Sequence, residues 1–315
     1  MKIAFCADPL AGFKTYKDST YAMMVEAARR GHEVHVFEQK DMAIDSGAVL
    51  ANVRRIRITD ATGTAADWFD AEAPAASPLH AFDAVIMRKD PPFDMEYIYA
   101  TYLLELAESQ GARVFNRPAA VRSNNEKLAI TQFPQFIAPT LVTSDDARIR
   151  AFHAEHRDII LKPLDGMGGT GIFRVRDDAM NLGAIIETLT ANGRTTIMVQ
   201  RFIPAIEKGD KRILLIGGAV VPFCLARLPQ GGEVRGNLAA GGLGVAQPIS
   251  ARDREIAEAL APQLAQRGLL LVGLDVIGDF MTEINVTSPT CFQEITQQTG
   301  FNVPALFMDA VEKAV

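Results

Sequence analysis

Runs of apolar residues near the start of the chain have the spacing of strands, and a stretch with helical spacing separates them. Residues 2–7 form a short apolar run typical of a buried strand, and residues 33–38 alternate between apolar and polar. Between them, Asp18 or Ser19 can cap a helix with apolar residues on one face. The pattern predicts a strand–helix–strand unit with parallel strands.

A second unit of the same kind follows. Its predicted elements are a strand over 84–88, a helix over about 94–110 and a return strand over 113–116. Residues 49–58 alternate weakly, and the Ala- and Pro-rich stretch around 74–78 indicates an exposed connection. Residues 1–122 are therefore predicted to form an N-terminal, parallel α/β domain.

The pattern changes after Pro118 to strands joined by helices and by a glycine-rich loop. The predicted strands cover 140–143, 158–163, 171–176 and 195–202, and the predicted helices lie near 145–156, 181–191 and 253–266. We divide this part into a small lobe, 123–203, and a C-terminal lobe, 204–315, which contains the glycine-rich segment 229–244. The expected fold class is α/β, with an α+β C-terminal half.

Length and composition bound the kind of protein. At 315 residues the chain is longer than a single hydrophobic core usually grows, so we expect two or three domains with a cleft between them. The formal net charge of −6 offers no general attraction to nucleic acids or to anionic membranes. No apolar segment approaches the roughly 18 residues of a membrane span. Any anion-binding site must therefore be local.

Cysteine usage indicates a reducing compartment. Cys6, Cys224 and Cys291 have neither metal-ligand spacing nor the even count of a disulfide framework. The apolar run before Asp8 is too short for the core of a signal peptide. We therefore expect a cytoplasmic protein without a membrane or nucleic-acid partner.

The densest local signal is the glycine-rich segment Lys162–Gly171, whose sequence is Lys-Pro-Leu-Asp-Gly-Met-Gly-Gly-Thr-Gly. Glycines allow positive φ and let successive backbone N–H groups point at one anion, so phosphate is the expected ligand. A dinucleotide fingerprint would need a helix directly after the loop, but residues 172–176 alternate like a strand. A hairpin turn without a ligand stays open as the alternative.

Basic residues occur where they could reach such phosphates. Lys127 and Lys162 lie at the edges of predicted elements, although either could simply be a solvated surface residue. Lys211, Arg212 and Arg227 lie beside apolar strands, where an unpaired charge would be costly to bury. A phosphate or carboxylate partner would remove that cost.

A predicted hairpin near the C-terminus carries two carboxylates and an amide in otherwise apolar strands. Alternation places Glu283 and Asn285 on one face, and a turn with an odd number of residues would place Asp275 opposite Glu283. Oxygen ligands of this kind suit Mg²⁺ bound together with nucleotide phosphates. The alternative is an exposed acidic hairpin, which the surrounding apolar residues disfavour.

Several motifs, taken in order, resemble those of bacterial glutathione synthetases, which are ATP-grasp enzymes. They are Asn-Glu-Lys-Leu at 125–128, Lys-Pro-Leu-Asp-Gly-Met-Gly-Gly at 162–169 and Glu-Ile-Asn-Val-Thr-Ser-Pro-Thr at 283–290, with further similarity at 87–94 and 229–244. The resemblance spans nearly the whole chain. It implies an N-terminal α/β domain followed by a two-lobed ATP-grasp domain.

The resemblance also implies roles for individual residues. It implies contacts to ATP by Lys127, Lys162, Asp165, Gly166, Gly168, Gly169, Gln200, Arg201, Phe202, Ile203 and Asp210. It implies metal ligation by Asp275, Glu283 and Asn285, with Mg²⁺ or Mn²⁺ as the ion. It implies charge stabilisation by Arg212, Arg227 and Arg235, and substrate contacts by Arg88, Ser288, Pro289 and Thr290.

The reaction implied by the resemblance is the ATP-driven joining of γ-glutamylcysteine and glycine through an acyl phosphate. Residues 229–244 contain six glycines and would form a lid that keeps water from this intermediate. The family resemblance also suggests a homotetramer. A different ATP-grasp ligase, or an ATP-binding module without catalysis, remains an alternative at this point.

Overall fold

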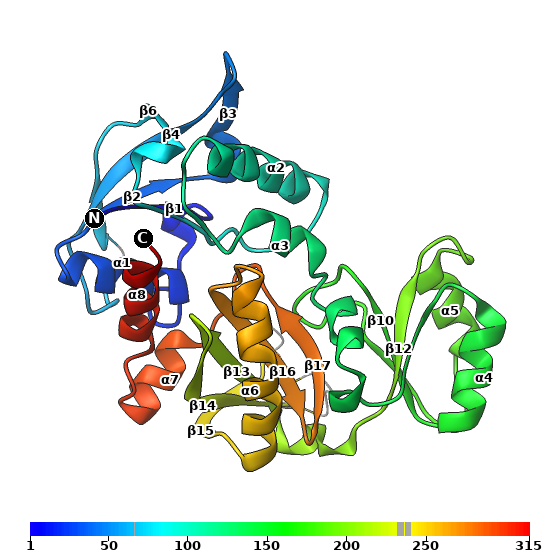
Figure 1. Ribbon diagram of the computed structural model, residues 1–315. Coiled ribbons are helices and arrows are strands. Elements are labelled where there is room, and N and C mark those ends of the chain that lie inside the picture. The colour runs from blue at the N-terminus through cyan, green and yellow to red at the C-terminus, as the bar shows by residue number, and fades with distance from the viewer. Residues whose placement is uncertain (66, 232–235, 237–240) are drawn as a thin grey trace.

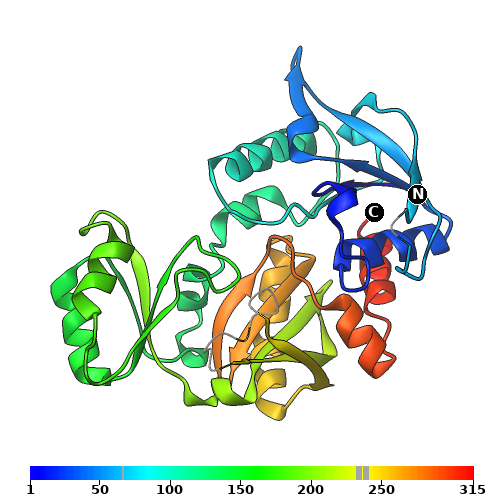
Figure 2. The same ribbon diagram turned by 180° about the vertical axis from the view of Figure 1, so that it is seen from behind.

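The computed structural model describes residues 1–65, 67–231, 236 and 241–315, which form three regions. Figure 1 shows an N-terminal region in blue to cyan, a lobe in green, and a C-terminal lobe in yellow and orange. Figure 2 shows the same regions from behind. In the described chain, no helix combines the length and apolar character needed to cross a membrane.

The N-terminal region is built on a sheet with the order β3-β4-β2-β1-β7-β8, in which β5 and β6 also pair with β4. Its elements are β1 (Lys2–Cys6), α1 (Ser19–Arg29), β2 (Glu33–Phe37), β3 (Met42–Asp45), β4 (Ala48–Ile58), β5 (Phe69–Ala71), β6 (Ala75–Pro78), β7 (Ala84–Met87), α2 (Met95–Ser109), β8 (Val114–Phe115) and α3 (Pro118–Ser123). The predicted parallel strands β1, β2, β7 and β8 are confirmed.

The antiparallel strands β3 to β6 correct one prediction. The stretch 74–78 is not a plain connection, because Ala75–Pro78 pairs with β4 as strand β6. The residues of β6 are exposed or half-buried, so the hydrophobic pattern gave no sign of a strand. Proline is compatible with this position because β6 ends at Pro78.

Two aspartates cap the N-terminal helices, and the first of them is one of the two candidates, Asp18 and Ser19, that the sequence offers. Asp18 accepts a hydrogen bond from the backbone N–H of Tyr21 (2.8 Å) at α1, and Asp94 accepts one from Tyr97 (2.9 Å) at α2. Helices α7 (Phe292–Thr299) and α8 (Val303–Ala314) return to this region at the end of the chain. Figure 1 shows α8, in red, beside α1, in blue.

The green lobe is a four-stranded antiparallel sheet with the order β11-β10-β12-β9. Its elements are β9 (Thr140–Thr143), α4 (Asp146–His156), β10 (Ile159–Pro163), β11 (Phe173–Val175), α5 (Leu182–Thr190) and β12 (Ile197–Arg201). The glycine-rich segment joins β10 to β11, so the prediction of a loop between two strands is confirmed. A short 3-10 helix, η4 (Leu128–Gln132), precedes this lobe.

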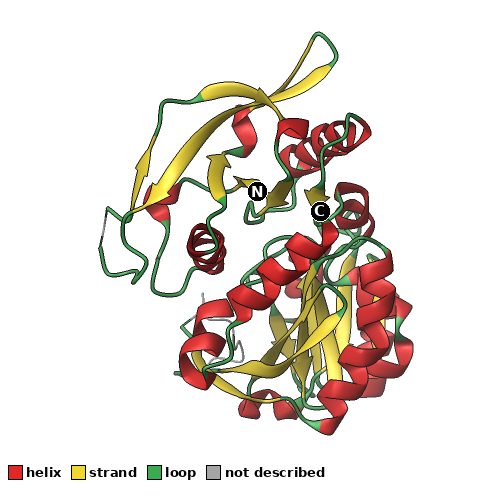
Figure 3. Cartoon of the chain, turned by 60° about the vertical axis from the view of Figure 1, so that its left-hand side comes forward, coloured by secondary structure: helices red, strands yellow, loops and turns green. Residues whose placement is uncertain are grey.

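The C-terminal lobe is a five-stranded antiparallel sheet with the order β15-β14-β13-β16-β17. Its elements are β13 (Asp210–Ile216), β14 (Ala219–Leu228), β15 (Leu243–Pro248), α6 (Ala251–Gln266), β16 (Leu271–Ile277) and β17 (Phe280–Asn285). Lys211 donates to Asp253 of α6, so this helix covers the face of the sheet to which Lys211 points. Figure 3 shows helices in red along the yellow strands of this lobe. Asp210 and Arg212 point to the opposite face, because side chains alternate along a strand.

Candidate active site

A cavity lies between the four-stranded and the five-stranded sheets, and we call it the inter-sheet cavity. It holds about 850 Å³ of empty space, a volume that includes the part open to solvent. Its walls include most of the residues predicted to contact a nucleotide: Lys127, Lys162, Gly166, Gly168, Gly169, Gln200, Arg201, Phe202, Ile203 and Asp210. Asp275 and Glu283 line it as well.

Two buried lysines face this cavity; Lys127 has one ion-pair partner, Glu283, and Lys162 has none among the described residues. Lys127 donates to the carbonyl of Gly166 in the glycine loop, and its Nζ lies 3.6 Å from Glu283 Oε1. Lys162, in β10, donates to the carbonyl of Thr282 at 3.2 Å. Burial lowers the pKa of Lys162 to about 8, although Glu283 opposes this effect. An anionic ligand would restore the stability of the charged form.

The five-stranded sheet contributes a connected network of charges on one face. Sheet register places Asp210 opposite Arg227 and Arg212 opposite Asp275. Arg227 Nη2 lies 2.5 Å from Asp210 Oδ2 and 2.9 Å from Asp275 Oδ2, and Arg212 donates to both oxygens of Asp275. Burial opposes ionisation of Asp275, but the two arginines together lower its pKa below the ordinary range.

Asp210 differs from Asp275 because one of its oxygens is unpaired. Burial raises the pKa of Asp210 above its ordinary range, although Arg227 opposes the rise. Asp210 Oδ1 is buried and, among the described residues, has no hydrogen-bond partner. A buried acceptor without a donor is costly, so this atom is suited to a hydroxyl or cation supplied by a ligand.

The hairpin of β16 and β17 brings the predicted metal ligands together. Asp275 pairs with Glu283 across the strands, which confirms the predicted pairing. The turn itself contains two residues, Gly278 and Asp279, rather than an odd number, but the connection holds three unpaired residues, the odd count that this pairing requires. The extra residue is Thr282, which bulges out of the ladder and donates from Oγ1 to the Asp275 carbonyl at 3.2 Å.

The chemistry of these side chains fits a divalent cation that prefers oxygen. Arginine N–H groups already use three of the roughly four acceptor positions of the Asp275 carboxylate, which leaves room for one more partner. Asn285 donates from Nδ2 to the Gly273 carbonyl at 3.2 Å, which turns its Oδ1 away from that carbonyl. Within the described residues, no three His, Cys, Asp or Glu side chains cluster as a metal site, so phosphate and water oxygens would have to complete this one.

A second cavity, which we call the adjoining cavity, meets the first at Gly166, Gly168 and Glu283. It holds about 830 Å³ of empty space, and Arg212, Arg227 and Asn285 line it. The predicted substrate residues Ser288, Pro289 and Thr290 lie in its wall. Ser288 Oγ donates to Asp90 Oδ1 at 2.5 Å, which fastens this segment to the N-terminal region.

Three predicted residues lie elsewhere. Arg88 lines neither cavity; it is buried behind them and donates to Thr20 Oγ1 and to the Pro289 carbonyl, both at 3.0 Å. Asp165 is exposed and lines a small hollow beside the adjoining cavity. Arg235, and with it the central part of the predicted lid 229–244, lies outside the described residues.

Sequence reasoning did not identify two residues that organise the site. Thr282 supplies both the bulge and the carbonyl that holds Lys162. Glu126 accepts hydrogen bonds from the segment after β17, although about 160 residues separate the partners in the chain. Glu126 is the middle residue of the motif Asn-Glu-Lys at 125–127. That motif was its only signal in the sequence, and the motif does not indicate this contact.

Two antiparallel sheets that enclose a cavity, with a glycine loop on one and carboxylates on the other, define the ATP-grasp class. The solved structure of D-cycloserine synthetase DcsG matches with a TM-score of 0.69 at 17% identity, over 100% of both chains. The RimK domain protein ATP-grasp from Sphaerobacter thermophilus matches with a TM-score of 0.63 at 20% identity, over 98% of this chain and 99% of the other. At such identities the likeness shows the fold alone.

The chain belongs to the prokaryotic glutathione synthetase family. Residues 1–122 match the family's N-terminal domain, and residues 126–300 match its ATP-grasp domain. A glutathione synthetase of Ralstonia nicotianae is 62% identical over 100% of this chain and 96% of its own. One from Vibrio parahaemolyticus is 49% identical over 100% and 99%, respectively. The predicted family and fold class are thereby confirmed, and membership implies an ATP-dependent ligase that uses a divalent metal and small-molecule substrates.

Proposed function

We propose that this protein joins γ-glutamylcysteine to glycine at the expense of ATP and gives glutathione, ADP and phosphate. The observation that carries the proposal is that Glu283 lines both cavities, while Asp275 in the wall of the first is paired with Arg212 and Arg227 in the wall of the second. A phosphoryl group that passes from a nucleotide in one cavity to a carboxylate in the other must cross this boundary. The relatives named glutathione synthetase support the choice of substrates.

In this proposal the inter-sheet cavity binds ATP. Lys127, Lys162 and the backbone of the glycine loop bind the phosphates, which gives Lys162 an anionic partner and Lys127 a second one beside Glu283. Residues 200–203 contact the adenine, because they form the wall at the end of β12. The unpaired Oδ1 of Asp210 accepts a hydrogen bond from a ribose hydroxyl.

Asp275, Glu283 and Asn285 would hold Mg²⁺ or Mn²⁺. When bound, such an ion neutralises charge on the phosphoryl group that is transferred. The protein's own contribution is electrostatic: Arg212 and Arg227 are fixed by carboxylates before any substrate arrives, so little reorganisation is needed.

The chemistry proceeds in two steps. A cysteinyl carboxylate oxygen of γ-glutamylcysteine forms a bond to the γ-phosphorus of ATP, the bond from that phosphorus to the β,γ-bridging oxygen breaks, and ADP and an acyl phosphate result. The amino nitrogen of glycine then forms a C–N bond to the acyl carbon, the C–O bond to phosphate breaks, and the nitrogen gives up a proton to solvent. The adjoining cavity, with Ser288, Pro289 and Thr290 in its wall, holds the peptide and the amine. Arg88 supports this wall from behind through the Pro289 carbonyl.

We also propose a cytoplasmic location and a homotetrameric assembly. All three cysteines are free and buried, which suits a reducing compartment. The tetramer has only the family resemblance in its support.

The test is ADP release measured with γ-glutamylcysteine alone, with glycine alone and with both, followed by mass spectrometry of the product. We expect rapid ADP release only when both are present, with one glutathione formed for each ADP. Equal turnover with an unrelated amino-acid pair would instead assign the protein to another ligase specificity. ATP binding without any ADP release under these conditions would refute a catalytic role.

A further inference from the structure

Glu126 directly precedes Lys127 in the chain and is hydrogen-bonded to β17, the strand that carries Glu283. Its backbone carbonyl accepts a hydrogen bond from the N–H of Ile284 at 2.8 Å. Its Oε1 accepts three more, from Val286 N (2.9 Å), Thr287 N (3.1 Å) and Thr287 Oγ1 (2.9 Å). Hydrogen bonds from several fixed donors hold this carboxylate in a single orientation.

The other carboxylate oxygen, Oε2, is left for a ligand. In the part of the chain that the structure describes, every side-chain hydrogen bond of Glu126 ends on Oε1. The residue as a whole is half-buried. Glu126 lines the adjoining cavity and the small hollow continuous with it, and both share Gly166, Met167 and Thr287.

The other carboxylates in this cavity are committed or exposed. Glu283 lies 3.6 Å from Lys127 and pairs across the strands with Asp275. Asp90 is exposed and already accepts a hydrogen bond from Ser288, and an exposed ion pair contributes little to binding. Glu126 is therefore an anchored, half-buried carboxyl group of the cavity. Burial raises its pKa, and a bound ammonium group would favour its charged form.

The charges of the adjoining cavity match a zwitterion. Arg212 and Arg227 provide positive charge on the wall formed by the five-stranded sheet, and Glu126 provides a carboxylate on another wall. An α-amino acid carries an amino group and a carboxylate only two bonds apart. Its carboxylate can therefore contact the arginines while its amino group contacts Glu126 in the same small cavity.

We propose that Glu126 binds the amino group of the acceptor amino acid through Oε2. This inference rests on the proposed function, in which an amine attacks an acyl phosphate. By holding the nitrogen, Glu126 sets which end of the acceptor faces the reacting carbon. The amino nitrogen is then oriented towards the acyl carbon before it attacks, because binding to Glu126 has already positioned it.

The test is Glu126→Gln, which keeps one oxygen for the three donors and replaces Oε2 with an N–H₂ group that cannot accept a hydrogen bond. We expect the KM for glycine to rise by roughly 10- to 100-fold, the effect of losing one hydrogen bond to a charged group. The KM values for ATP and γ-glutamylcysteine should stay within about twofold, since neither ligand contacts Oε2 in this proposal.

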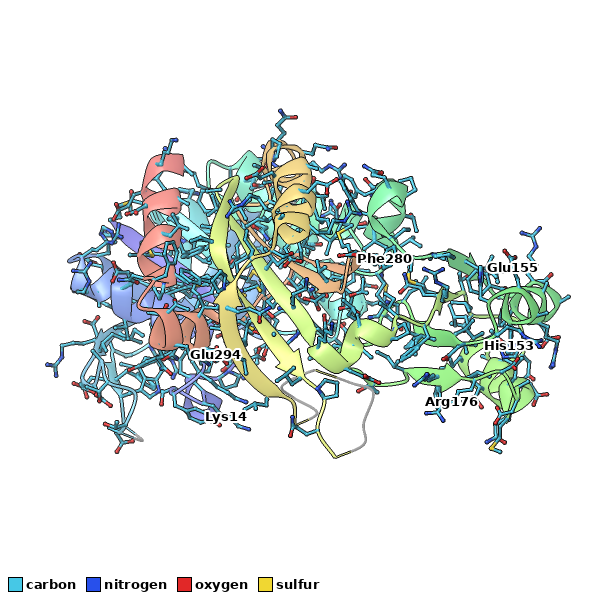
Figure 4. The ribbon with its side chains drawn as sticks, turned by 90° about the horizontal axis from the view of Figure 1, so that it is seen from below. Lys14, His153, Glu155, Arg176, Phe280 and Glu294 are labelled. Carbon is cyan, nitrogen blue, oxygen red and sulfur yellow. The ribbon has the colours of Figure 1, made fainter. Side chains whose placement is uncertain are left out.

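A second measurement isolates the step before the amine. Isotope exchange between the β,γ-bridging and β non-bridging oxygens of ATP, with γ-glutamylcysteine and no glycine, reports reversible acyl phosphate formation and should be unchanged in Glu126→Gln. The matched control is Glu294→Gln, a partly buried glutamate of α7 whose Oε2 lacks a partner among the described residues. Figure 4 labels Glu294 on α7, apart from Phe280 at the tip of the β16–β17 hairpin. This control should behave as wild type in both assays.

The outcomes separate the inference from the proposed function. If wild type forms glutathione and Glu126→Gln has an unchanged KM for glycine, the inference is wrong and the proposed function stands. If isotope exchange and thermal stability fall together in Glu126→Gln but not in the control, Glu126 serves the fold and the inference is again wrong. If wild type forms no peptide from these substrates, the proposed function fails and the inference fails with it.

Discussion

The two sides of the inter-sheet cavity present their positive charges in different ways. On the side of the glycine loop, Lys127 and Lys162 donate to backbone carbonyls, and no carboxylate approaches either one closer than 3.6 Å among the described residues. On the side of the five-stranded sheet, Arg212 and Arg227 are both fixed by Asp275.

This difference indicates separate roles: the lysine side is suited to bind the nucleotide phosphates, and the arginine side holds its positive charges in fixed positions before a ligand arrives. A buried lysine without a carboxylate partner is destabilised in the empty protein and gains when a phosphate arrives, so its charge is available to the ligand. A buried arginine that is already paired gains less from a ligand, but it holds a fixed position. We therefore expect substitutions on the two sides to divide differently between stability and activity.

The largest effect should come from breaking the paired side with Arg227→Met. This change leaves Asp210 and Asp275 with fewer partners, and removal of one partner from a buried ion pair costs about 3–5 kcal/mol. Denaturant unfolding should show that loss, and ADP release should fall to background. The control is Arg57→Met, whose ion pair with Asp70 is largely exposed and should contribute less than about 1 kcal/mol. Equal stability of the two variants would show that the buried network is not structural.

A smaller effect, confined to nucleotide binding, is expected on the lysine side. Lys162→Met removes a buried cation that has no carboxylate partner among the described residues, so the free energy of unfolding should stay the same or rise. The Kd for ATP should increase by roughly 10- to 100-fold, because a hydrogen bond to a charged phosphate is lost. Isothermal titration calorimetry and denaturant unfolding measure the two quantities.

The matched control for this variant is Lys211→Met, which removes a largely buried lysine of the five-stranded sheet that does have a carboxylate partner. Lys211 donates to the buried carboxylate of Asp253 and to the Gly278 carbonyl, on the face covered by α6. Its loss should lower stability and leave the Kd for ATP unchanged, which is the reverse of the pattern expected for Lys162→Met. If both variants lose stability and affinity together, the proposed division between the two sides is wrong.

The sequence predicted the parts of the site that depend on local pattern. Asp275 and Glu283 could be paired because period-two alternation runs through both strands. The glycine loop could be placed between strands because residues 172–176 alternate, and Asp18 was one of two cap candidates, with Ser19, before the first helical segment.

The parts that depend on contacts between distant segments could not be predicted in this way. The turn has two residues instead of an odd number, and the bulge at Thr282 supplies the third unpaired residue. No local pattern distinguishes a bulged strand from a longer turn. The contact of Glu126 with Val286 and Thr287 depends on how the lobes close. Strand β6 escaped notice because its exposed residues lack the apolar alternation that marks a half-buried strand.

The smallest effect is expected for an ion network outside the cavities, where it should change stability without changing activity. Glu26, in α1, accepts hydrogen bonds from Arg29 and Arg30 at 2.8 Å, and Arg30 also contacts Asp309 of α8 at 2.7 Å. The hydrogen bonds from Arg29 lower the pKa of Glu26 from 4.5 to about 2, against the opposing effect of burial.

The sign of the pH dependence follows from this lowered pKa. Because the folded state favours ionised Glu26, its contribution is complete above about pH 4.5 and is lost as the pH falls towards 2. Glu26→Gln should therefore lower the free energy of unfolding by about 1–2 kcal/mol at pH 7, and ligase activity should stay unchanged. The loss is this small because Arg29 is largely exposed, so solvent weakens its ion pair with Glu26. Unfolding measured at pH 7, 4.5 and 3 should show the gap from wild type closing as the pH falls. A gap of constant size would mean that packing around the side chain, rather than its charge, connects α1 to α8.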